Sequence, residues 1–277
     1  MKVATTVAEL CADRALVNDY LEDLLLTEAV TRRDGPVQRA MRYAVLGAAQ
    51  RIRPILALRV ARLLRAPAAP TLKAASAVEL LHCASLIVDD LPCMDDSPTR
   101  RNKPSVHIEF GEATAVLASF ALVALSARTA AESECNDDHR QSHSGFQMRL
   151  LRTLDCSGLI DGQAMDLRLD GVNRVGGCAG VTELKTVPLF EIAVAAATTF
   201  AAIDENELAL LRCFGREFGL AFQITDDLLD GDYVDRAMLD EKLITLRAVV
   251  APFGSQRGPL EELIDYLHAR VAEADPQ

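Results

Sequence analysis

The segment "LIVDDLPCMDDSPTRRNK", Leu86 to Lys103, places acidic and basic residues directly after an apolar run. Its charged residues are Asp89, Asp90, Asp95 and Asp96, followed by Arg100, Arg101 and Lys103. Asp89 and Asp95 would lie about 240° apart around an ideal helix, so a regular helix would keep them on different faces. Pro92 lies between them and should break the regular turn. We therefore expect a distorted helix end that brings both carboxylates to one cation.

A second acidic cluster follows far downstream, in "FGLAFQITDDLLDGDYVD", Phe218 to Asp235. Asp226 and Asp230 are one helical turn apart, about 40° around the axis, so they share one face. Two carboxylates at this spacing repel each other unless a cation lies between them. Carboxylate oxygens are the ligands that Mg²⁺ prefers, so this pair is a candidate metal site.

Either cluster alone is explained equally well as a solvated acidic helix end. Two clusters, each after an apolar helical run and one followed by the pair Arg100 and Arg101, favour a different explanation. Carboxylates that hold Mg²⁺ beside arginines would bind a diphosphate, because the metals bridge phosphate oxygens and the arginines neutralise the remaining charge.

The composition narrows the class of protein. The chain has 277 residues, half of them hydrophobic, with a net charge of -11 and a pI near 5.0. A uniform basic face for nucleic acid is therefore not expected. The seven cysteines form no C-x-x-C pair, which argues against a disulfide framework or zinc site and favours the cytoplasm. The longest uncharged apolar stretch, Ala113 to Ala127, is shorter than the ~20 residues of a membrane span. We expect a core helix there, and no membrane span.

Apolar residues recur mostly at helical spacing, and no convincing strand alternation is present. The pattern predicts one all-α domain over residues 1–277, a helical bundle in which Asp204 and Glu207 form a capping box. Pro54 should kink or split the second helix, and residues 132–145 should form a polar loop. Helices are expected near 5–27, 36–64, 72–91, 112–133, 146–169, 182–201, 205–231, 235–251 and 258–273.

Both acidic motifs resemble those of the trans-isoprenyl diphosphate synthases. The resemblance rests on "DDLPCMDD", "RR", "KP" and "FQITDDLLD", in order, and runs from about Ala40 to Lys242. The supporting segments are "QRIRP" (50–54), "ELLHCASLIVDD" (79–90), "GLIDGQAMDL" (158–167) and "KTVPLF" (185–190). It implies an all-α homodimer with a deep central cavity, which joins isopentenyl diphosphate head-to-tail to an allylic diphosphate.

The resemblance also implies roles for single residues. Three Mg²⁺ ions would be held by Asp89, Asp95 and Asp226, with Asp90 and Asp230 in support. Arg100 and Lys185 would bind the allylic diphosphate, whereas Arg53, His82 and Arg101 would bind isopentenyl diphosphate. Thr186 and Gln223 would flank the allylic cation. Without the resemblance, His82 would more often be a core histidine, and Lys185 with Thr186 could equally be a polar pair that starts a helix.

Two positions depart from the family pattern. Gln50 stands where the family usually has a lysine that binds isopentenyl diphosphate. Replacing the lysine by glutamine removes a charge-assisted hydrogen bond of roughly 1.5–3 kcal/mol. The segment after Asp230 is shortened, which leaves Lys242 as the candidate for the last lysine of the substrate site. Ser97, Pro98 and Asn102 are also unusual within the first motif.

The residues before Asp89 bear on the product. Ala84 and Ser85 are small, where shorter-chain enzymes of the family often carry an aromatic floor, and Pro92 with Cys93 lengthens the motif. These features predict geranylgeranyl diphosphate as the main product. Two alternatives are a class I terpene cyclase, which needs no isopentenyl site, and a non-catalytic partner subunit of a synthase, which the departures at Gln50 and after Asp230 would suit.

Overall fold

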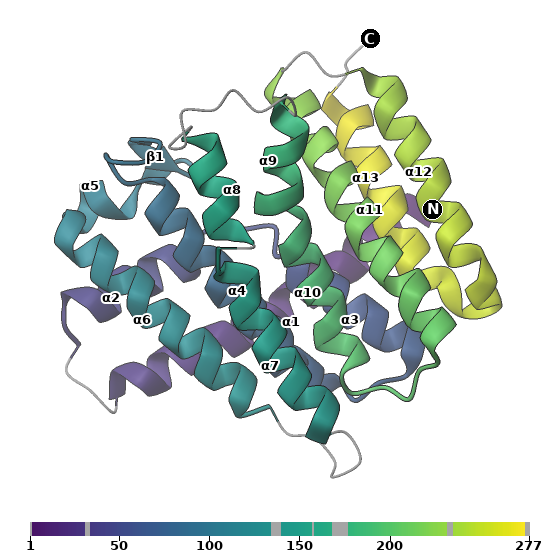
Figure 1. Ribbon diagram of the computed structural model, residues 1–277, viewed down its shortest axis with the longest axis horizontal. Helices are drawn as coiled ribbons and strands as arrows, with labels where there is room; N and C mark the ends of the chain where they lie inside the picture. The colour runs from purple at the N-terminus through teal and green to yellow at the C-terminus, as the bar shows by residue number, and fades with distance from the viewer. Residues whose placement is uncertain are drawn as a thin grey trace.

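Two apolar helices, α4 (Ala68–Asp89) and α10 (Val187–Thr198), lie at the centre of the bundle (Figure 1). Helix α4 packs against α3, α6 and α10, and α10 also packs against α11. One face of α4 joins the larger apolar cluster through Val78 and Leu81, while another face joins a second cluster through Leu80 and Ala84. This computed structural model describes residues 2–30, 34–133, 140–156, 158–167, 177–231 and 235–274.

The other elements surround these two helices, and in Figure 1 the C-terminal helices α11, α12 and α13 lie together on one side of the bundle. A short antiparallel hairpin, β1 and β2, follows α4. The bounds are α1 (Lys2–Val30), α2 (Pro36–Val45), α3 (Ile52–Leu64), β1 (Thr99–Arg100), β2 (Lys103–Pro104), α5 (Val106–Phe110), α6 (Glu112–Ala131), α7 (Arg140–Leu154), α8 (Leu159–Asp166), α9 (Gly177–Lys185), α11 (Glu205–Asp230), α12 (Arg236–Val250), the 3-10 helix η2 (Ala251–Arg257) and α13 (Gly258–Ala274). The predicted all-α class is confirmed.

The helix expected over 36–64 is split, but not at Pro54. The break lies at residues 46–51, between α2 and α3, and Pro54 falls in the first turn of α3, where a missing N–H is tolerated. Arg51 caps α3 with a left-handed backbone, at φ 55°. The expectation of a kink at Pro54 was therefore wrong, because position within the helix decides what a proline does.

Two further expected helices are also interrupted. The helix predicted over 146–169 divides into α7 and α8 around residues 155–158, and the helix predicted over 182–201 divides into α9 and α10 at Thr186. The polar loop predicted over 132–145 is shorter than expected, because α7 already begins at Arg140. Residues 134–139 of that loop lie outside the described residues.

Helix α11 carries the second acidic motif, and its two ends are fixed by local chemistry. Asp204 accepts a hydrogen bond from the backbone N–H of Glu207, whose side chain accepts one from Asp204 N–H, so the predicted capping box is confirmed. Gly231 ends the helix in the left-handed region, at φ 82°. Within the helix, a Cβ added at Gly219 would lie 2.9 Å from the Phe190 ring, so only glycine lets α11 approach α10 this closely.

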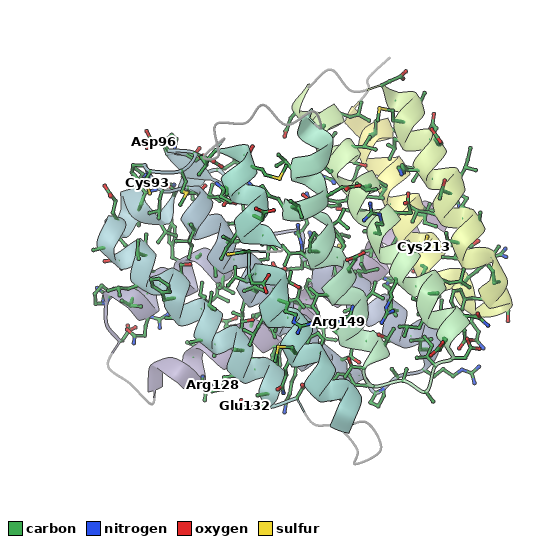
Figure 2. All side chains as sticks on the ribbon, in the orientation of Figure 1. Cys93, Asp96, Arg128, Glu132, Arg149 and Cys213 are labelled. Carbon is green, nitrogen blue, oxygen red and sulfur yellow. The ribbon has the colours of Figure 1, made fainter. Side chains whose placement is uncertain are left out.

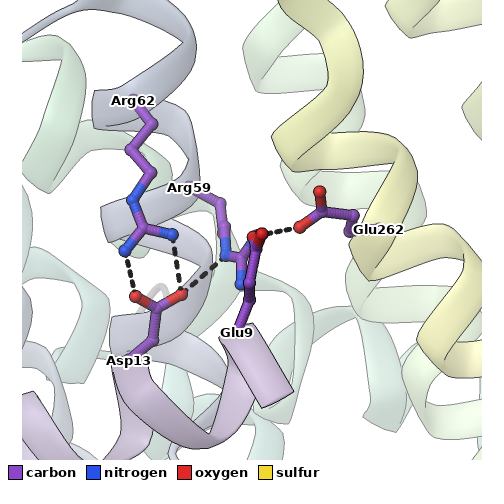
Figure 3. A network of polar contacts seen from close by, with 5 residues as sticks. All are labelled: Glu9, Asp13, Arg59, Arg62 and Glu262. Atoms are coloured by element: carbon purple, nitrogen blue, oxygen red, sulfur yellow. Dashed lines mark hydrogen bonds and ion pairs between the residues drawn. The ribbon is translucent and has the colours of Figure 1, made fainter. Parts of the chain in front are cut away.

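A buried ion-pair network joins the N-terminal helix to α3 and α13 (Figure 3). Nε of Arg59 donates to Oδ2 of Asp13 across 2.6 Å, and both side chains are about 1% exposed. Glu262 from α13 also pairs with Arg59, as does Glu9. Because α13 carries a residue of the candidate site described below, this network links the stability of the fold to the geometry of the site.

Helices α4 and α6 are both long and apolar enough, by length and composition alone, to cross a membrane. The two helices differ in how much of their apolar segment is buried inside the protein: 67% in α4 and 44% in α6. Helix α4 is thus a core helix, since core helices of soluble proteins pass the same test. The expected core helix over Ala113 to Ala127 is buried on one face only, because Leu117 and Phe120 are exposed.

Candidate active site

The first acidic motif folds back on the end of α4. The backbone N–H of Asp95 donates to the carbonyl of Asp89 across 2.9 Å, and the N–H of Met94 donates to Leu91. Regular helical bonding stops at this point, which is where Pro92 was expected to end it. The predicted distorted helix end is confirmed, and it brings Asp95 back beside Asp89.

The carboxylates of Asp89 and Asp95 interact strongly enough to affect protonation. The pKa of Asp89 is raised from 3.8 to about 6, first because burial penalises the charged form and then because Asp95 and Asp90 are negative. The ammonium group of Lys185 and the guanidinium of Arg100 oppose this rise. A buried carboxylate beside another carboxylate is stabilised in its charged form when a cation binds between them.

The pKa of Asp89 predicts a pH dependence for Mg²⁺ binding. Because a proton and a cation compete for this carboxylate, affinity should fall up to about tenfold per pH unit below pH 6. Calorimetric titration of Mg²⁺ in the presence of inorganic diphosphate measures this, and Asp89→Asn should remove the effect. An unchanged pH profile in that variant would contradict the assignment.

The same shift affects stability. The carboxyl group of Asp89 ionises more easily in the unfolded chain, so it lowers the free energy of unfolding as the pH rises from 3.8 to about 6.

The other two aspartates of the motif have different surroundings. Asp90 is buried, and its carboxylate accepts a hydrogen bond from Nε of Arg100 across 3.0 Å. Its predicted supporting role at the metal stays a prediction, since Arg100 is the partner that the structure gives it. Asp96 is exposed, and Figure 2 shows it with Cys93 at the edge of the molecule, in the loop between α4 and β1.

The segment after the motif is a two-residue hairpin that presents basic groups. Thr99 pairs with Pro104 and Arg100 with Lys103, so Arg101 and Asn102 form the turn. Both turn residues have positive φ, 53° and 61°. Asparagine tolerates this conformation better than most residues, which explains the unusual Asn102. The turn brings Arg101 to the cavity described below.

Arg53 of α3 and His82 of α4 are joined by a hydrogen bond. Nη1 of Arg53 donates to Nε2 of His82 across 3.2 Å, and the guanidinium lies 4.7 Å from the centroid of the Phe190 ring. Since arginine only donates, Nε2 of His82 accepts and the ring proton belongs on Nδ1. Burial and the neighbouring arginines lower the pKa of His82 well below its usual value, so the ring is neutral at pH 7.

Beside this pair is a salt bridge that sequence reasoning had not assigned. The buried guanidinium of Arg51 donates to Glu79 across 2.7 Å and to Asn18 across 2.9 Å. It also binds the carbonyl of Val45, at the end of α2. Arg51 thus fixes the loop between α2 and α3, which holds Gln50 at the cavity.

The second motif begins at Asp226, whose carboxylate is paired with a basic residue from α13. Nη2 of Arg270 donates to Oδ1 of Asp226 across 2.8 Å. Burial raises the pKa of Asp226. The positive charges of Arg270 and Arg53 oppose this rise, whereas the negative charge of Asp230 adds to it. Asp230, the last residue of α11, is exposed. Arg270 was missed from the sequence because its contact with Asp226 is made only by the packing of α13.

The junction between α9 and α10 reaches both motifs. Lys185, whose charge acts on Asp89, pairs with Asp166 of α8 across 2.7 Å. A Cβ at Gly162 would lie 2.8 Å from the Lys185 side chain, so glycine at this position lets α8 approach α9 closely. Thr186, the next residue, donates to Oε1 of Gln223 on α11 across 3.0 Å.

Gln223 itself is held at both ends of its amide. Its Oε1 accepts from Thr186, and its Nε2 donates to Oδ1 of Asp227 across 2.7 Å. The second aspartate of the "TDD" motif therefore orients Gln223, a role that sequence reasoning did not give it. Both Thr186 and Gln223 line the cavity.

Part of this site lines a cavity of about 590 Å³. Eight of the predicted site residues line it: Gln50, Arg53, His82, Arg100, Arg101, Thr186, Gln223 and Asp226. Lys242 does not, because its ammonium group pairs with Glu217 across 2.7 Å, about 13 Å along α11 from Asp226. Asp89, Asp90, Asp95, Lys185 and Asp230 are also absent from the lining of this cavity, so the roles expected for these residues and for Lys242 stay predictions.

The acidic residues occur as pairs, and this bears on which metal they fit. Within the described part of the chain, no three His, Cys, Asp or Glu residues are close enough to enclose an ion by themselves. Mg²⁺ is usually bound by one or two carboxylates together with substrate phosphates and water. The two pairs, Asp89 with Asp95 and Asp226 with Asp230, fit that mode.

The all-α bundle carries two acidic motifs, and its cavity is lined by Asp226 of the second motif and by a basic cluster, an arrangement that suits a diphosphate. The polyprenyl synthetase family model matches residues 35–239. The chain belongs to the polyprenyl synthetase family.

Among curated proteins, geranylgeranyl pyrophosphate synthase 10, mitochondrial, from Arabidopsis thaliana is 37% identical over 213 residues. That match covers 74% of this chain and 61% of the relative, so the chain spans about three fifths of its length.

The bundle is also similar to solved structures. A geranyltransferase from Legionella pneumophila has 26% identity and a TM-score of 0.88, over 98% of this chain and all of that one. A farnesyl/geranylfarnesyl diphosphate synthase from Zymomonas mobilis has 28% identity and a TM-score of 0.81, over 93% of this chain and 99% of that one.

Proposed function

We propose that this protein is a Mg²⁺-dependent prenyltransferase that condenses isopentenyl diphosphate head-to-tail with an allylic diphosphate. The observation that carries the proposal is the arrangement of one cavity between acidic and basic groups. The acidic motifs suit a metal-bound diphosphate, whereas Arg53, His82 and Arg101 suit a second diphosphate without metal. Extension of an allylic diphosphate by five-carbon units, in the presence of Mg²⁺, tests it.

The chain's own residues have distinct parts in this reaction. Arg100 and Lys185 would hold the allylic diphosphate, and their charges stabilise it as a leaving group. Bound Mg²⁺ would add Lewis-acid neutralisation of the same developing charge. Arg53 and Arg101 would hold isopentenyl diphosphate with its double bond toward the allylic carbon.

The allylic cation then needs polar groups that do not react with it. Thr186 and Gln223 line the cavity, and hydrogen bonds fix the Gln223 amide. Their dipoles would stabilise positive charge at the allylic carbon. Attack by the isopentenyl double bond forms the new carbon–carbon bond, and a proton is lost to the departing diphosphate.

The same cavity supports this proposal over a terpene cyclase. A cyclase binds one diphosphate, so it has no use for a second cluster of arginine and histidine donors. Nε of Arg53 and Nδ1 of His82 are buried and have no hydrogen-bond partner within the described residues. Two unused donors in one basic cluster support a second anionic substrate. A cyclic hydrocarbon formed from geranylgeranyl diphosphate alone would favour the cyclase.

For the product we propose geranylgeranyl diphosphate. Ser85 lies one helical turn before Asp89, so it shares the face of α4 that carries the metal-binding carboxylate. Ala84 points elsewhere: it is buried, and its carbonyl accepts a hydrogen bond from Ser119 of α6. A small serine beside the reacting centre leaves room for a chain longer than fifteen carbons.

Ser85→Phe should therefore shorten the main product to fifteen carbons, because an aromatic ring one turn below Asp89 would block further growth. Chromatography of the dephosphorylated products measures the chain length. Ala84→Phe is the matched comparison, and it should act mainly on stability, since overpacking costs about 1–3 kcal/mol. Unchanged product length in Ser85→Phe would disprove the proposed channel wall.

We further propose a homodimer that forms through α6. Val116, Leu117 and Phe120 are exposed on this helix, at 37%, 55% and 69%. Helix α7 packs beside it and exposes Met148 and Leu151. Exposed apolar side chains on two neighbouring helices suit a second copy of the same face. The molar mass in solution, with Phe120→Glu as the disrupting variant, tests this proposal.

A further inference from the structure

The side chain of Arg101 reaches the cavity without a partner of its own. Burial lowers the pKa of Arg53 and of His82, and the nearby charge of Arg101 adds to both shifts. No hydrogen bond or ion pair holds the Arg101 guanidinium within the described residues, whereas the neighbouring Arg100 is paired with Asp90. The position of Arg101 therefore depends on the backbone of the hairpin turn that carries it.

The hairpin turn does not keep its shape by itself. Arg101 and Asn102 have positive φ, a conformation that only glycine adopts freely. Each strand has two residues, and a two-stranded hairpin is marginally stable unless it packs against another element. Packing is incomplete here, because a cavity of about 40 Å³ lies between the hairpin and the helices α2 and α4. Polar contacts must therefore help to hold the hairpin in place.

Each strand of the hairpin has a polar anchor. On β1, the ion pair between Arg100 and the buried Asp90 ties the strand to the end of α4. On β2, both residues are exposed, and the hydroxyl of Tyr43 from α2 donates to the carbonyl of Pro104 across 2.8 Å. The Tyr43 ring makes an edge contact with Phe110, with the centroids 5.3 Å apart. Tyr43 thus ties the second strand of the hairpin to α2.

We propose that Tyr43 is a positioning residue for the isopentenyl substrate: its hydroxyl fixes the turn that holds Arg101 at the diphosphate without metal. Tyr43 lines the space behind the hairpin and not the substrate cavity, so it acts on the substrate only through the turn. The same helix supports the loop of Gln50, because the carbonyl of Val45 binds Arg51. This inference rests on the proposed function and adds a residue to it.

Tyr43→Phe tests the inference because it removes the hydroxyl and keeps the ring contact with Phe110. We expect the KM for isopentenyl diphosphate to rise roughly 3- to 10-fold, the value of one neutral hydrogen bond. The KM for the allylic substrate should change less than twofold, because Asp90 still holds Arg100. Calorimetric titration of isopentenyl diphosphate, with a chelator present, should show the same loss of affinity without turnover. Tyr20→Phe is the matched control, since Tyr20 of α1 is half-buried and its hydroxyl has no hydrogen bond within the described residues.

A double-mutant cycle with Arg101→Gln shows whether the effect passes through that arginine. If it does, Tyr43→Phe should change the KM for isopentenyl diphosphate less than twofold once Arg101 is replaced. A full additional loss in that background would overturn the inference, because Tyr43 would then act by another route. Unchanged affinity in Tyr43→Phe, or equal weakening of both substrates with a lower Tm, would also overturn it. Failure of the proposed function is distinguishable, because the unaltered protein would then not extend any allylic substrate.

Discussion

Asp89→Ala should lower kcat/KM for condensation by on the order of 10³- to 10⁴-fold, while the free energy of unfolding stays the same or rises. Neutralising a departing diphosphate through a carboxylate-held cation contributes several kcal/mol to the barrier, and Asp89 is the most perturbed carboxylate of the site. Its removal should not harm the fold, because burial already disfavours its charged form. Steady-state kinetics and urea unfolding of the same preparation measure both effects.

The control for this experiment is Asp96→Ala, in the same loop. Asp96 is exposed at the edge of the molecule, so its removal should change kcat/KM less than threefold (Figure 2). If Asp89→Ala kept more than a tenth of the activity, or if both variants lost equally, the assignment of Asp89 to the metal would be wrong.

Arg59→Met should lower the free energy of unfolding by about 3–5 kcal/mol, the largest effect on stability that we expect. Arg59 is about 1% exposed and holds Asp13, Glu9 and Glu262 together (Figure 3). Methionine fills similar space but leaves carboxylates from α1 and α13 beside one another without a counter-charge. Urea unfolding followed by circular dichroism measures the change.

Two variants show whether the loss comes from the buried charges. Arg62→Met removes an arginine that also pairs with Asp13 but is 47% exposed, so it should cost less than about 1 kcal/mol. The double variant Asp13→Leu/Arg59→Met replaces the buried pair by apolar groups and should recover part of the lost stability. Equal losses in the Arg59 and Arg62 single variants would contradict this explanation.

The helical class was predictable because apolar residues recur at helical spacing along the chain. The interruptions were harder to predict, since they depend on tertiary packing. The break between α2 and α3 is held by Arg51, whose partners Glu79 and Asn18 come from other helices. The hairpin was missed because strands of two residues are too short to show alternation.

The acidic motifs and eight of the cavity residues were also predictable, because each motif is contiguous in the sequence. The pairing of Lys242 with Glu217 could not be predicted, because counting along the chain does not show which way α12 turns this lysine. Arg270 was missed for the opposite reason: it lies far along the chain from Asp226, and only the packing of α13 brings it back. Asp227 was overlooked because its contact with the Gln223 amide can be seen only in the folded structure.

The most direct test of the proposed function is incubation of the purified protein with Mg²⁺, isopentenyl diphosphate and one allylic starter of five, ten or fifteen carbons. The products are then separated by chain length after removal of the diphosphate. We predict linear extension in five-carbon steps that stops mainly at twenty carbons and disappears when Mg²⁺ is chelated. No extension from any of the three starters would contradict the proposed function.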